Sequence, residues 1–563
     1  MDLAGSNPQR AHDVAGTSVS VCPAGERFPL PQAEEYAREF ARLQALVAEQ
    51  RALGREIVVV MGVGFVGAIM AGVVADSVNR NTGKPGKFVM AMQRPSARSY
   101  WKIPYLNRGV APVQAEDPEV GPLIRRTVLE KRTLTATFTY DALALADVVI
   151  VDVQCDYVKD ALGDMRQGHA DIAALEESFQ VIGERIPPGC LVLIETTVPP
   201  GTTEHLAAPL LQRAFAARGL PAAPLLAHSY ERVMPGRHYV ASVRDFWRVC
   251  SGINAAARAR VVAFLSEVLN VEQFPLTVLD RPLESETCKV IENSYRATLL
   301  AFLDEWSLFA ERTGIDLVKL IQAIQVRPTH SNILFPGPGI GGYCLPKDGA
   351  LGLWAYRHLL GFEEETLPLT TAAININDTR GLHVADLVGE ALEELGRPLA
   401  GAPVLVCGAS YREDVGDTRY SGSELVVRRL VELGAAVRVH DPYLEHWYEL
   451  EKQEEYPARG QSRGRFFQQQ EGVGRIRVQS DLAAALRGAQ AVVLAVRHAP
   501  YLDLDPDWLL QQTAGPVALI DCFGILSDET IRRYCRLGCA VRGLGRGHIR
   551  RITEAVRPER PRT

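Results

Sequence analysis

The chain has 563 residues, of which 47% are hydrophobic and 23% are charged, values typical of a globular protein. This length exceeds what one hydrophobic core organises, so we expect roughly two to four domains. The formal charge of -6 gives no basic surface for nucleic acid, and no apolar run reaches the roughly 20 residues of a membrane span.

The ten cysteines are scattered along the chain, without a CxxC pair or a His/Cys cluster at zinc spacing. Dispersed cysteines suit a reducing compartment, and residues 1–27 are polar and lack the apolar core of a signal peptide. We therefore expect a cytoplasmic protein with no metal site, and with neither nucleic acid nor a membrane as a partner.

The first predicted elements form an N-terminal extension, residues 1–54. Residues 1–30 show no apolar periodicity, and we expect a flexible lead there. Apolar residues at helical spacing then predict one helix over 31–53.

Residues 55–280 alternate short apolar runs, typical of buried strands, with helical stretches. This alternation predicts a doubly wound, Rossmann-like domain with a parallel sheet. The strands are expected at 57–61, 88–91, 148–153, 191–194 and 225–227.

The pattern becomes helical over 281–398. The helix expected over 285–313 is apolar on more than one face, so it is predicted to lie at a domain junction or in a subunit interface. More helix is expected over 350–395.

A second strand–turn–helix pattern begins at Pro403. Residues 399–550 are therefore predicted to form a second Rossmann-like domain, with a surface insertion over 449–474 and a loose tail over 551–563. The expected fold class is α/β: two Rossmann-like doubly wound domains joined by a central all-helical region with a long helix. A further strand and turn of the second domain are expected over 437–443, and further strands at 491–496 and 517–521.

A glycine-rich turn, Gly62-Val63-Gly64-Phe65-Val66-Gly67, joins the first strand of the 55–280 domain to its first helix. Its glycines allow a tight turn and the close approach of a pyrophosphate to the helix N-terminus; the plain alternative is a turn without a ligand. The next strand ends in Gln93-Arg94, where a carboxylate usually binds the adenosine ribose. Gln93 can still bind a ribose hydroxyl, whereas Arg94 can attract a 2′-phosphate. We therefore expect NAD as the cofactor and leave NADP open.

A second motif, Gly341-Gly342-Tyr343-Cys344-Leu345-Pro346-Lys347-Asp348, places a thiol beside a lysine and a carboxylate. The thiolate is the reactive form of cysteine, and a nearby cation lowers the pKa of a thiol. The alternative is an inert, buried cysteine, the commoner case. Together with a dinucleotide turn in the same chain, Cys344 indicates oxidation of an aldehyde through a covalent thioester.

Six segments, in register, resemble the UDP-glucose/GDP-mannose dehydrogenase family, the nucleotide-sugar 6-dehydrogenases. The resemblance covers about residues 55–545. It implies oxidation of a sugar CH2OH group to a carboxylate in two hydride transfers, consuming two NAD molecules, in support of acidic polysaccharide synthesis. The segments are 62–67, 195–203, 230–236, 289–293, 341–348 and 411–419.

The resemblance assigns catalytic roles. Cys344 is the nucleophile that adds to the intermediate aldehyde, and Lys289 stabilises the developing oxyanion; without the resemblance, Lys289 would be a surface lysine. Asn293, four residues later on the same helical face, holds a water or hydroxyl. Asp348 orients that water and Lys289, or acts as the base.

Thr197 follows the strand expected at 191–194, and the resemblance implies that it contacts the cofactor or a catalytic water; otherwise it is a turn residue. Glu231 is implied as a general base or water holder, or else is a solvated loop carboxylate. Pro235 stands where some family members carry a second carboxylate. The segment 231–236 resembles the branch acting on UDP-N-acetylhexosamines, although Tyr230 replaces the usual proline.

The resemblance also implies a substrate site. Glycine-rich turns let backbone amides approach a phosphate, and guanidinium groups suit diphosphate or sugar oxygens, although Arg327 and Arg419 have surface ion pairs as their alternative. Arg412 stands where the family commonly has lysine. The expected substrate-binding residues are Glu231, Arg232, Lys289, Asn293, Arg327, Phe335, Gly339, Gly341, Tyr411, Arg412 and Arg419.

Two other functions fit parts of the sequence. A two-electron β-hydroxyacid dehydrogenase shares the first domain and the helical centre, but it has neither a cysteine nucleophile nor a third domain. The other function is that of a catalytically silent nucleotide-sugar-binding protein. This alternative is disfavoured because Cys344, Lys289 and Asp348 are all present. The apolar helix over 285–313 further predicts a homodimer or a higher homo-oligomer.

Overall fold

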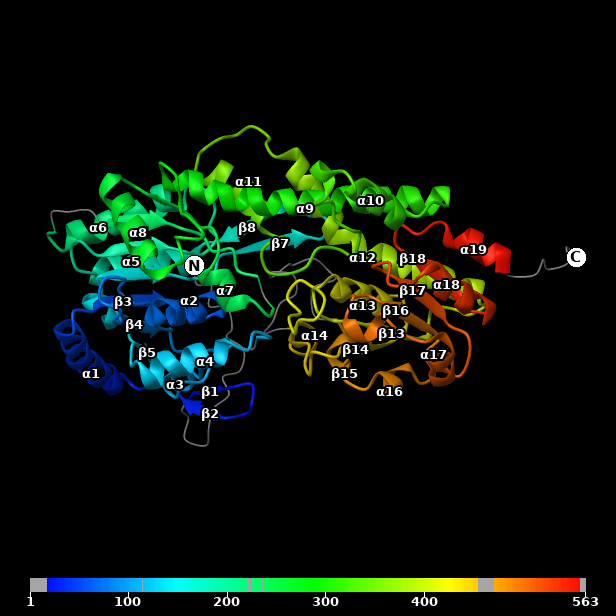
Figure 1. Cartoon of the computed structure of the whole chain (residues 1–563), viewed down its shortest axis with the longest axis horizontal. Helices are drawn as coiled ribbons and strands as arrows, with labels where there is room; N and C mark the ends of the chain where they lie inside the picture. Colours follow the sequence, from blue (N-terminus) through cyan, green and yellow to red (C-terminus); the bar gives the residue numbers. More distant parts are fainter. Residues whose placement is uncertain (1–17, 114, 221–223, 235, 454–469, 557–563) are drawn as a thin grey trace, which may run out of the picture. The chain divides into compact units, whose positions relative to one another are not determined.

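The computed structural model describes residues 18–113, 115–220, 224–234, 236–453 and 470–556 (Figure 1). The chain divides into two compact units, Met1–Cys155 with Ile172–Lys289 and Asp156–Asp171 with Val290–Thr563. Pro235, most of the expected insertion and residues 557–563 lie outside the described residues.

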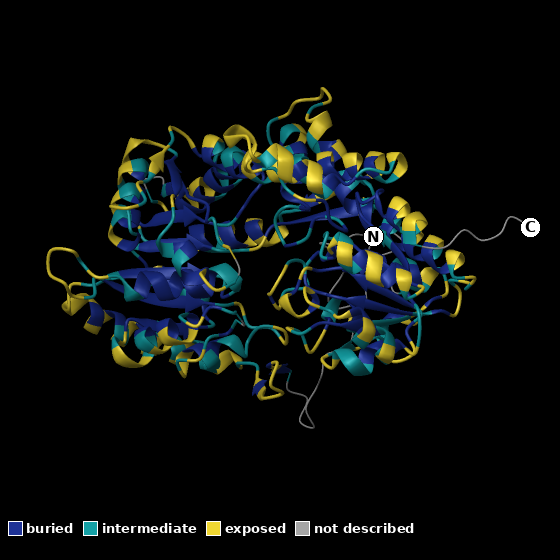
Figure 2. Cartoon of the chain, turned by 45° about the vertical axis from the view of Figure 1, so that its right-hand side comes forward, coloured by how far each residue is buried: buried dark blue, intermediate teal, exposed yellow. Residues whose placement is uncertain are grey.

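An eight-stranded sheet forms the centre of the first unit, in the order β12-β11-β10-β9-β6-β3-β4-β5. Neighbouring strands are parallel except β10 with β11. Parallel strands covered on both faces are apolar throughout, and in β3 every residue from Ile57 to Met61 is buried (dark blue strands in Figure 2). The strands are β3 (Glu56–Met61), β4 (Lys87–Met92), β5 (Leu134–Thr137), β6 (Val148–Val151), β9 (Leu191–Ile194), β10 (Leu225–His228), β11 (Val249–Gly252) and β12 (Thr277–Val278).

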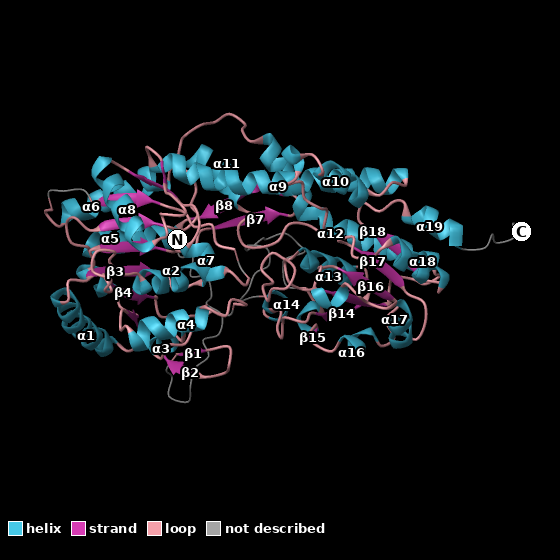
Figure 3. Ribbon diagram, viewed as in Figure 1, coloured by secondary structure: helices cyan, strands magenta, loops and turns pink. Residues whose placement is uncertain are grey.

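Helices pack against this sheet (Figure 3). The α2 helix, which follows the glycine-rich turn, buries all residues from Gly67 to Ala75, so it lies in the core of the unit. The helices are α1 (Ala33–Ala52), α2 (Phe65–Asp76), α3 (Lys102–Asn107), α4 (Val120–Arg125), α5 (Ala173–Arg185), α6 (Ala208–Ala217), α7 (Tyr239–Arg244) and α8 (Ala255–Val268), with short turns at η1 (Arg126–Glu130), η2 (Tyr140–Leu145) and η3 (Thr202–Ala207).

The N-terminal extension contains the predicted helix as α1, which buries Leu43 and Val47. The lead before it is not wholly irregular, because β1 (Val19–Val21) and β2 (Arg27–Pro29) form an antiparallel hairpin. Phe28 on this hairpin is buried. Strands of three residues are too short to show a period in the sequence, which is why the hairpin was not predicted.

The second unit contains a six-stranded sheet with the order β15-β14-β13-β16-β17-β18, parallel throughout. This confirms the predicted second doubly wound sheet, and the expected α/β fold class is confirmed. The strands are β13 (Pro403–Cys407), β14 (Ala436–His440), β15 (Val478–Gln479), β16 (Ala491–Leu494), β17 (Ala518–Asp521) and β18 (Ala540–Gly543).

The helices of the second unit begin with the 32-residue helix α9, which confirms the predicted long helix. The stretch expected as helix over 350–395 is two helices, because Gly361 adopts φ 73° and Pro368 begins a new helix. The helices are α9 (Pro282–Thr313), α10 (Leu317–Gln325), α11 (Asp348–His358), α12 (Pro368–Glu394), α13 (Gly422–Glu432), α14 (Tyr448–Glu451), α16 (Leu482–Leu486), α17 (Pro506–Thr513), α18 (Asp528–Arg536) and α19 (Ile549–Val556), with short turns at η4 (Pro328–His330), η6 (Val473–Arg475) and η7 (Ala499–Tyr501).

Three expectations about the organisation of the chain were wrong. The hairpin β7 (Asp156–Ala161) and β8 (Asp164–Asp171) belongs to the second unit, so the domain expected over 55–280 is interrupted there, whereas the elements described between 282 and 398 are all helical, as expected. Residues 551–556 of the expected loose tail form the end of α19, held by the buried Ile552. The expected surface insertion begins in α14, where Leu450 is buried in the core.

Among the described residues, no helix combines the length and the apolar content needed to cross a membrane.

Candidate active site

The glycine-rich turn has the shape that a dinucleotide requires. Gly62 adopts φ 107°, and a Cβ there would collide with the carbonyl of Asp152. A Cβ on Gly67, the third residue of α2, would collide with the carbonyl of Gly62. Gly64, the N-cap of α2, instead faces open space. Backbone amides at a helix N-terminus with free space before them fit a pyrophosphate, so the residues present fit NAD.

The other predicted cofactor residues lie at this turn. Gln93, directly after β4, accepts a hydrogen bond from the Val63 N–H at 2.9 Å. Arg94 forms two hydrogen bonds to the Glu177 carboxylate, at 2.8 and 3.0 Å. Phe65 and Val66 begin α2, and the Phe65 ring stacks on Tyr239 with ring centroids 4.4 Å apart.

A buried carboxyl cluster, not predicted from the sequence, lies behind the turn. Asp152 follows β6 and Glu195 follows β9, and Arg248 pairs with Glu195 at 2.5 Å. Burial, and then the charges of Glu195 and Glu231, raise the pKa of Asp152 well above its usual range. Asp152 therefore holds its proton more tightly than an exposed aspartate does. The signal in the sequence was the position of both acids directly after buried parallel strands.

Lys289 and Glu231 lie together in the first unit. The Lys289 ammonium donates to the Glu231 backbone carbonyl at 2.8 Å and lies 3.7 Å from its carboxylate. Both residues are buried, and the ammonium is 5.3 Å from the centre of the Tyr230 ring. Burial, and then the Lys289 charge, lower the pKa of His228 to about 3, so this histidine is neutral. Lys289 is thus a desolvated cation and not a surface lysine.

Thr197 and Arg232 complete the predicted residues of this unit. Thr197 is buried three residues after the end of β9. Arg232 donates to the Trp247 carbonyl at 3.0 Å, and its guanidinium lies 5.5 Å from the centre of the Tyr230 ring.

Cys344 differs from most other cysteines of the chain in its exposure. Eight of the ten are buried, and only Cys288 and Cys344 are partly exposed. Burial raises the pKa of Cys190 to about 12 and of Cys250 to about 11, so these thiols are inert. The Cys288 sulfur lies 3.2 Å from the Tyr230 hydroxyl. Cys344 is therefore the thiol best placed to react.

The start of α11 forms around Cys344. The Cys344 carbonyl accepts hydrogen bonds from the backbone N–H groups of Lys347 and Asp348, at 3.1 and 3.0 Å. The Asp348 carboxylate binds the Lys347 ammonium at 3.0 Å through one oxygen and the Asn293 amide at 2.7 Å through the other. The structure thus brings Asp348 and Asn293 together, and Lys347 joins them.

The hairpin β7–β8 contacts residues 341–348, which we call the cysteine loop. Lys159 donates to the Pro346 carbonyl at 2.9 Å and to the Asp378 carboxylate at 2.6 Å, and all of this contact is buried. The Tyr343 hydroxyl donates to Asp156 at the start of the hairpin. Lys159 lies 187 residues from Pro346 in the sequence, and no local pattern marks it.

A loop after β13 packs against the cysteine loop. A Cβ on Gly341 would lie 2.6 Å from the Tyr411 Cβ, and the Gly342 N–H donates to the Arg419 carbonyl at 3.0 Å. The Arg419 guanidinium lies 5.6 Å from the centre of the Tyr343 ring and binds Asp417 at 2.6 Å. Tyr411 and Arg419 therefore lie against the segment that leads into Cys344.

Two pKa shifts describe this neighbourhood. Burial raises the pKa of Tyr411 to about 12, so its hydroxyl stays protonated. Burial opposes the charge of Arg419, but Asp417 outweighs it and, with the negative charge of Cys344, raises the pKa of the guanidinium. Arg419 thus keeps its positive charge in this buried neighbourhood.

The β13 loop is held by Asp441, which was not predicted as a site residue. Asp441 follows β14, and its carboxylate accepts the backbone N–H groups of Ala409 and Ser410 at 2.8 and 3.1 Å. His498 lies 3.1 Å from the same oxygen. The carboxyl ends of two strands therefore shape the loop that carries Tyr411 and Arg419.

The remaining predicted substrate residues are more exposed. Gly339 lies beside Gly422, where a Cβ would collide with the Pro338 carbonyl. Arg412 is partly exposed, Phe335 is exposed, and Arg327 is exposed just after α10. Among the described residues, we find no hydrogen bond or ion pair between Arg327 and the cysteine loop, so the role of Arg327 stays a prediction.

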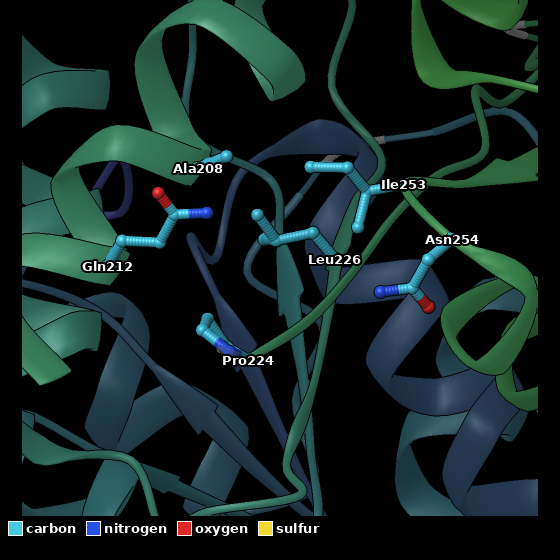
Figure 4. A pocket seen from close by; sticks show the side chains of 6 residues that line it. All are labelled: Ala208, Gln212, Pro224, Leu226, Ile253 and Asn254. Atoms are coloured by element: carbon cyan, nitrogen blue, oxygen red, sulfur yellow. The ribbon is translucent and has the colours of Figure 1, made fainter. Parts of the chain in front are cut away.

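Two further features carry no catalytic group. Asp316, Asp528 and His548 could together hold a metal ion, but Lys319 and Arg546 already balance their charge. A small pocket of the first unit contains no acid, base or thiol (Figure 4). It is lined by Ala208, Gln212, Pro224, Leu226, Ile253 and Asn254.

Models of one family match three successive parts of the chain. The NAD binding domain of the UDP-glucose/GDP-mannose dehydrogenase family matches residues 56–265, its central domain 283–379 and its UDP binding domain 405–528. These matches confirm the resemblance and the expected NAD cofactor.

Individual relatives agree with these matches. The chain is 26% identical over 449 residues to the UDP-N-acetyl-D-mannosamine dehydrogenase of Pyrococcus horikoshii, covering 79% of this chain and 92% of the relative. It is 25% identical over 350 residues to the UDP-glucose 6-dehydrogenase YwqF of Bacillus subtilis, covering 61% of this chain and 72% of the relative.

A solved structure extends the comparison to the fold. The NDP-N-acetyl-D-galactosaminuronic acid dehydrogenase from Methanosarcina mazei Go1 is 28% identical, with a TM-score of 0.70, and the match covers 90% of this chain and 98% of that one. One chain thus combines a dinucleotide turn, a UDP binding domain and a partly exposed thiol. Its activity is that of an NAD-dependent nucleotide-sugar dehydrogenase. This chain belongs to the UDP-glucose/GDP-mannose dehydrogenase family.

Proposed function

We propose that the chain oxidises the C6 hydroxymethyl group of a UDP-N-acetylhexosamine to a carboxylate, through a thioester on Cys344. The observation that carries this proposal is the state of Cys344, which is partly exposed beside Arg419 while eight other cysteines are buried. The product is a nucleotide-linked uronic acid, a donor suited to acidic polysaccharide synthesis. The substrate class follows the Pyrococcus horikoshii relative, and UDP-glucose is the alternative, after the Bacillus subtilis relative.

The proposed reaction balances with two cofactor molecules and one water. Bound NAD accepts a hydride from C6 in each of two steps. The first step also releases the hydroxyl proton to a base and leaves an aldehyde. The Cys344 thiolate adds to that aldehyde, loss of the second hydride leaves a thioester, and water cleaves the C–S bond to give the carboxylate and the thiol.

Other residues of the chain support these steps in the proposal. Lys289 is a buried cation that stabilises the oxyanion formed when sulfur or water adds to the carbonyl carbon. The carboxylate of Glu231, 3.7 Å from Lys289, holds water or acts as the base. The Asn293 amide and the Asp348 carboxylate, 2.7 Å apart, orient the hydrolytic water.

The stoichiometry of cofactor reduction tests the proposed function. Purified chain is given limiting UDP-ManNAc, UDP-GlcNAc, UDP-glucose or GDP-mannose with excess NAD, and NADH is counted per sugar consumed. We expect two NADH per sugar and the highest kcat/KM with a UDP-N-acetylhexosamine. One NADH per sugar would instead indicate the two-electron dehydrogenase, and binding without reduction would indicate the silent binding protein.

We also propose that the chain is a homodimer formed through α9. Ile291, Tyr295, Phe302, Trp306 and Phe309 recur at intervals of three, four or seven residues along this helix. Each of these five side chains is at least 46% exposed. An exposed apolar stripe with this spacing is the pattern by which one helix packs on a second.

Replacing Trp306 by Asp should break this dimer. A charge at the centre of an apolar interface should weaken association by at least about 30-fold, because hot-spot aromatic residues contribute roughly 2 kcal/mol or more. Sedimentation velocity over a range of concentrations measures the change. Arg296→Asp, on another exposed face of α9, is the matched control and should leave the assembly intact. A wild-type chain that sediments as a monomer would refute the dimer.

A further inference from the structure

The carboxyl end of β4 lacks the group that normally selects NAD. An Asp or Glu at this position binds the ribose hydroxyls and repels a 2′-phosphate. Here Gln93 holds the position, and its side-chain oxygen is already used by the Val63 N–H at 2.9 Å. A neutral amide fixes the glycine-rich turn without adding a negative charge beside the ribose.

The segment around Gln93 is basic. From Lys87 to Arg108 the sequence contains five Lys or Arg residues and no Asp or Glu. The buried Lys87 pairs with the partly buried Glu56 at 2.6 Å and also with Glu267, so its charge is balanced locally. Lys102 donates to the Val63 carbonyl at 3.0 Å, and burial followed by the charge of Arg98 lowers its pKa. The segment therefore places basic side chains, and no acidic side chain of its own, beside the adenosine end, with Lys87, Arg94 and Arg108 each paired to a carboxylate.

Two hydroxyl groups lie in the same turn. The Ser96 and Ser99 Oγ atoms are 2.7 Å apart, and the Ser99 hydroxyl donates to the Arg94 carbonyl at 3.1 Å. A phosphate monoester is bound by guanidinium groups together with hydroxyl donors. If the two hydroxyl groups rotate away from these contacts, Arg94, Ser96 and Ser99 supply both kinds of donor within six residues after β4.

Arg94 is held by a partner that a ligand can replace. Its ion pair with Glu177 is formed by side chains that are 61% and 49% exposed. Exposed ion pairs contribute little net stability. A 2′-phosphate has three acceptor oxygens and carries more negative charge than one carboxylate does. Exchange of Glu177 for the phosphate therefore leaves the Arg94 charge paired.

We propose that the turn Gln93–Ser99 is a 2′-phosphate site and that the chain binds NADP at least as tightly as NAD. This inference deepens the cofactor side of the proposed function and is independent of the thioester route. A chain that oxidised no sugar would still show the binding difference, so failure of one proposal is distinguishable from failure of the other.

Calorimetric titration of the full chain tests the site without turnover. The probes are NADP, NAD, and the fragments 2′,5′-ADP and 5′-ADP, which differ only in the position of one phosphate. We expect NADP to bind at least as tightly as NAD, and 2′,5′-ADP to bind about 10-fold more tightly than 5′-ADP, as a charge-assisted contact provides. Weaker binding of NADP than of NAD, or equal binding of the two fragments, would overturn the proposal.

Four variants locate the effect. Arg94→Ala should weaken NADP about 10-fold and leave NAD unchanged, and Gln93→Glu should do the same by repulsion. Glu177→Gln should tighten NADP alone, because it removes the competitor for Arg94. Arg108→Ala is the matched control, since Arg108 lies in the same basic segment and pairs with Glu26 at 2.7 Å with similar exposure. Equal loss of NADP affinity in Arg94→Ala and Arg108→Ala would contradict a defined phosphate site.

Discussion

Replacing Cys344 by Ser should lower the formation of carboxylate by roughly 10³-fold or more, because a covalent route without its nucleophile keeps only positioning and electrostatic catalysis. The first hydride transfer needs no sulfur, so trace aldehyde should form and be trapped by a hydrazine. NAD binding should be unchanged, because the glycine-rich turn belongs to the first unit and Cys344 to the second. Product analysis by mass spectrometry and a cofactor titration measure these effects.

Cys288→Ser is the matched control for that substitution. Cys288 is the other partly exposed cysteine, and a serine can retain its contact with the Tyr230 hydroxyl. We expect near-normal carboxylate formation from this variant. Alkylation of the wild-type chain followed by peptide mapping should modify Cys344 first. Carboxylate formed by Cys344→Ser at the wild-type rate would refute the thioester route.

The second large effect is expected from Lys159→Met on the β7–β8 hairpin. Lys159 is buried and forms an ion pair with the equally buried Asp378, 2.6 Å away. Removing one partner of a buried pair leaves an uncompensated charge, so the free energy of unfolding of the second unit should fall by about 3–5 kcal/mol. Denaturant titration followed by a probe in that unit measures the loss.

The same variant tests how the hairpin positions the thiol. Lys159 also donates to the Pro346 carbonyl, two residues after Cys344. Its loss should therefore change the pH profile of Cys344 alkylation at temperatures where the chain remains folded. The double variant Lys159→Met/Asp378→Leu removes both charges and should recover much of the stability, but not the alkylation profile.

Arg166→Met provides the control on the same hairpin. Arg166 pairs with Glu365 at 3.2 Å with both side chains exposed, and such pairs contribute about 0–1 kcal/mol. If Lys159→Met costs no more stability than Arg166→Met, the buried pair does not anchor the cysteine loop.

The fold was largely predictable because its signals are local. The strand at Leu191–Ile194 is a short apolar run bounded by polar turns, and its predicted ends agree with the structure. The long helix α9 followed from apolar spacing alone. The β7–β8 hairpin was missed because its partners, such as Asp378, lie more than two hundred residues away, at a separation of 219 from Lys159.

The candidate site divides in the same way. Gly62, Gly67 and Cys344 were proposed from the sequence, because a steric requirement or a reactive group belongs to the residue itself. The roles of Lys347, Asp441 and Asp152 emerged only from their contacts. Arg327 was predicted from its chemistry and has no described contact that supports or opposes its role.

The sequence by itself determined two largely parallel sheets, the glycine-rich turn and the family of this chain, and it singled out Cys344 as a candidate nucleophile, since each depends on residue type and short-range order. Only the tertiary structure decided which charges meet. It paired Arg94 with Glu177, buried Lys289 against Glu231 and fastened the cysteine loop to Lys159. The physical reason is that electrostatic partners are selected by proximity in space and by desolvation, and neither quantity is encoded in local spacing.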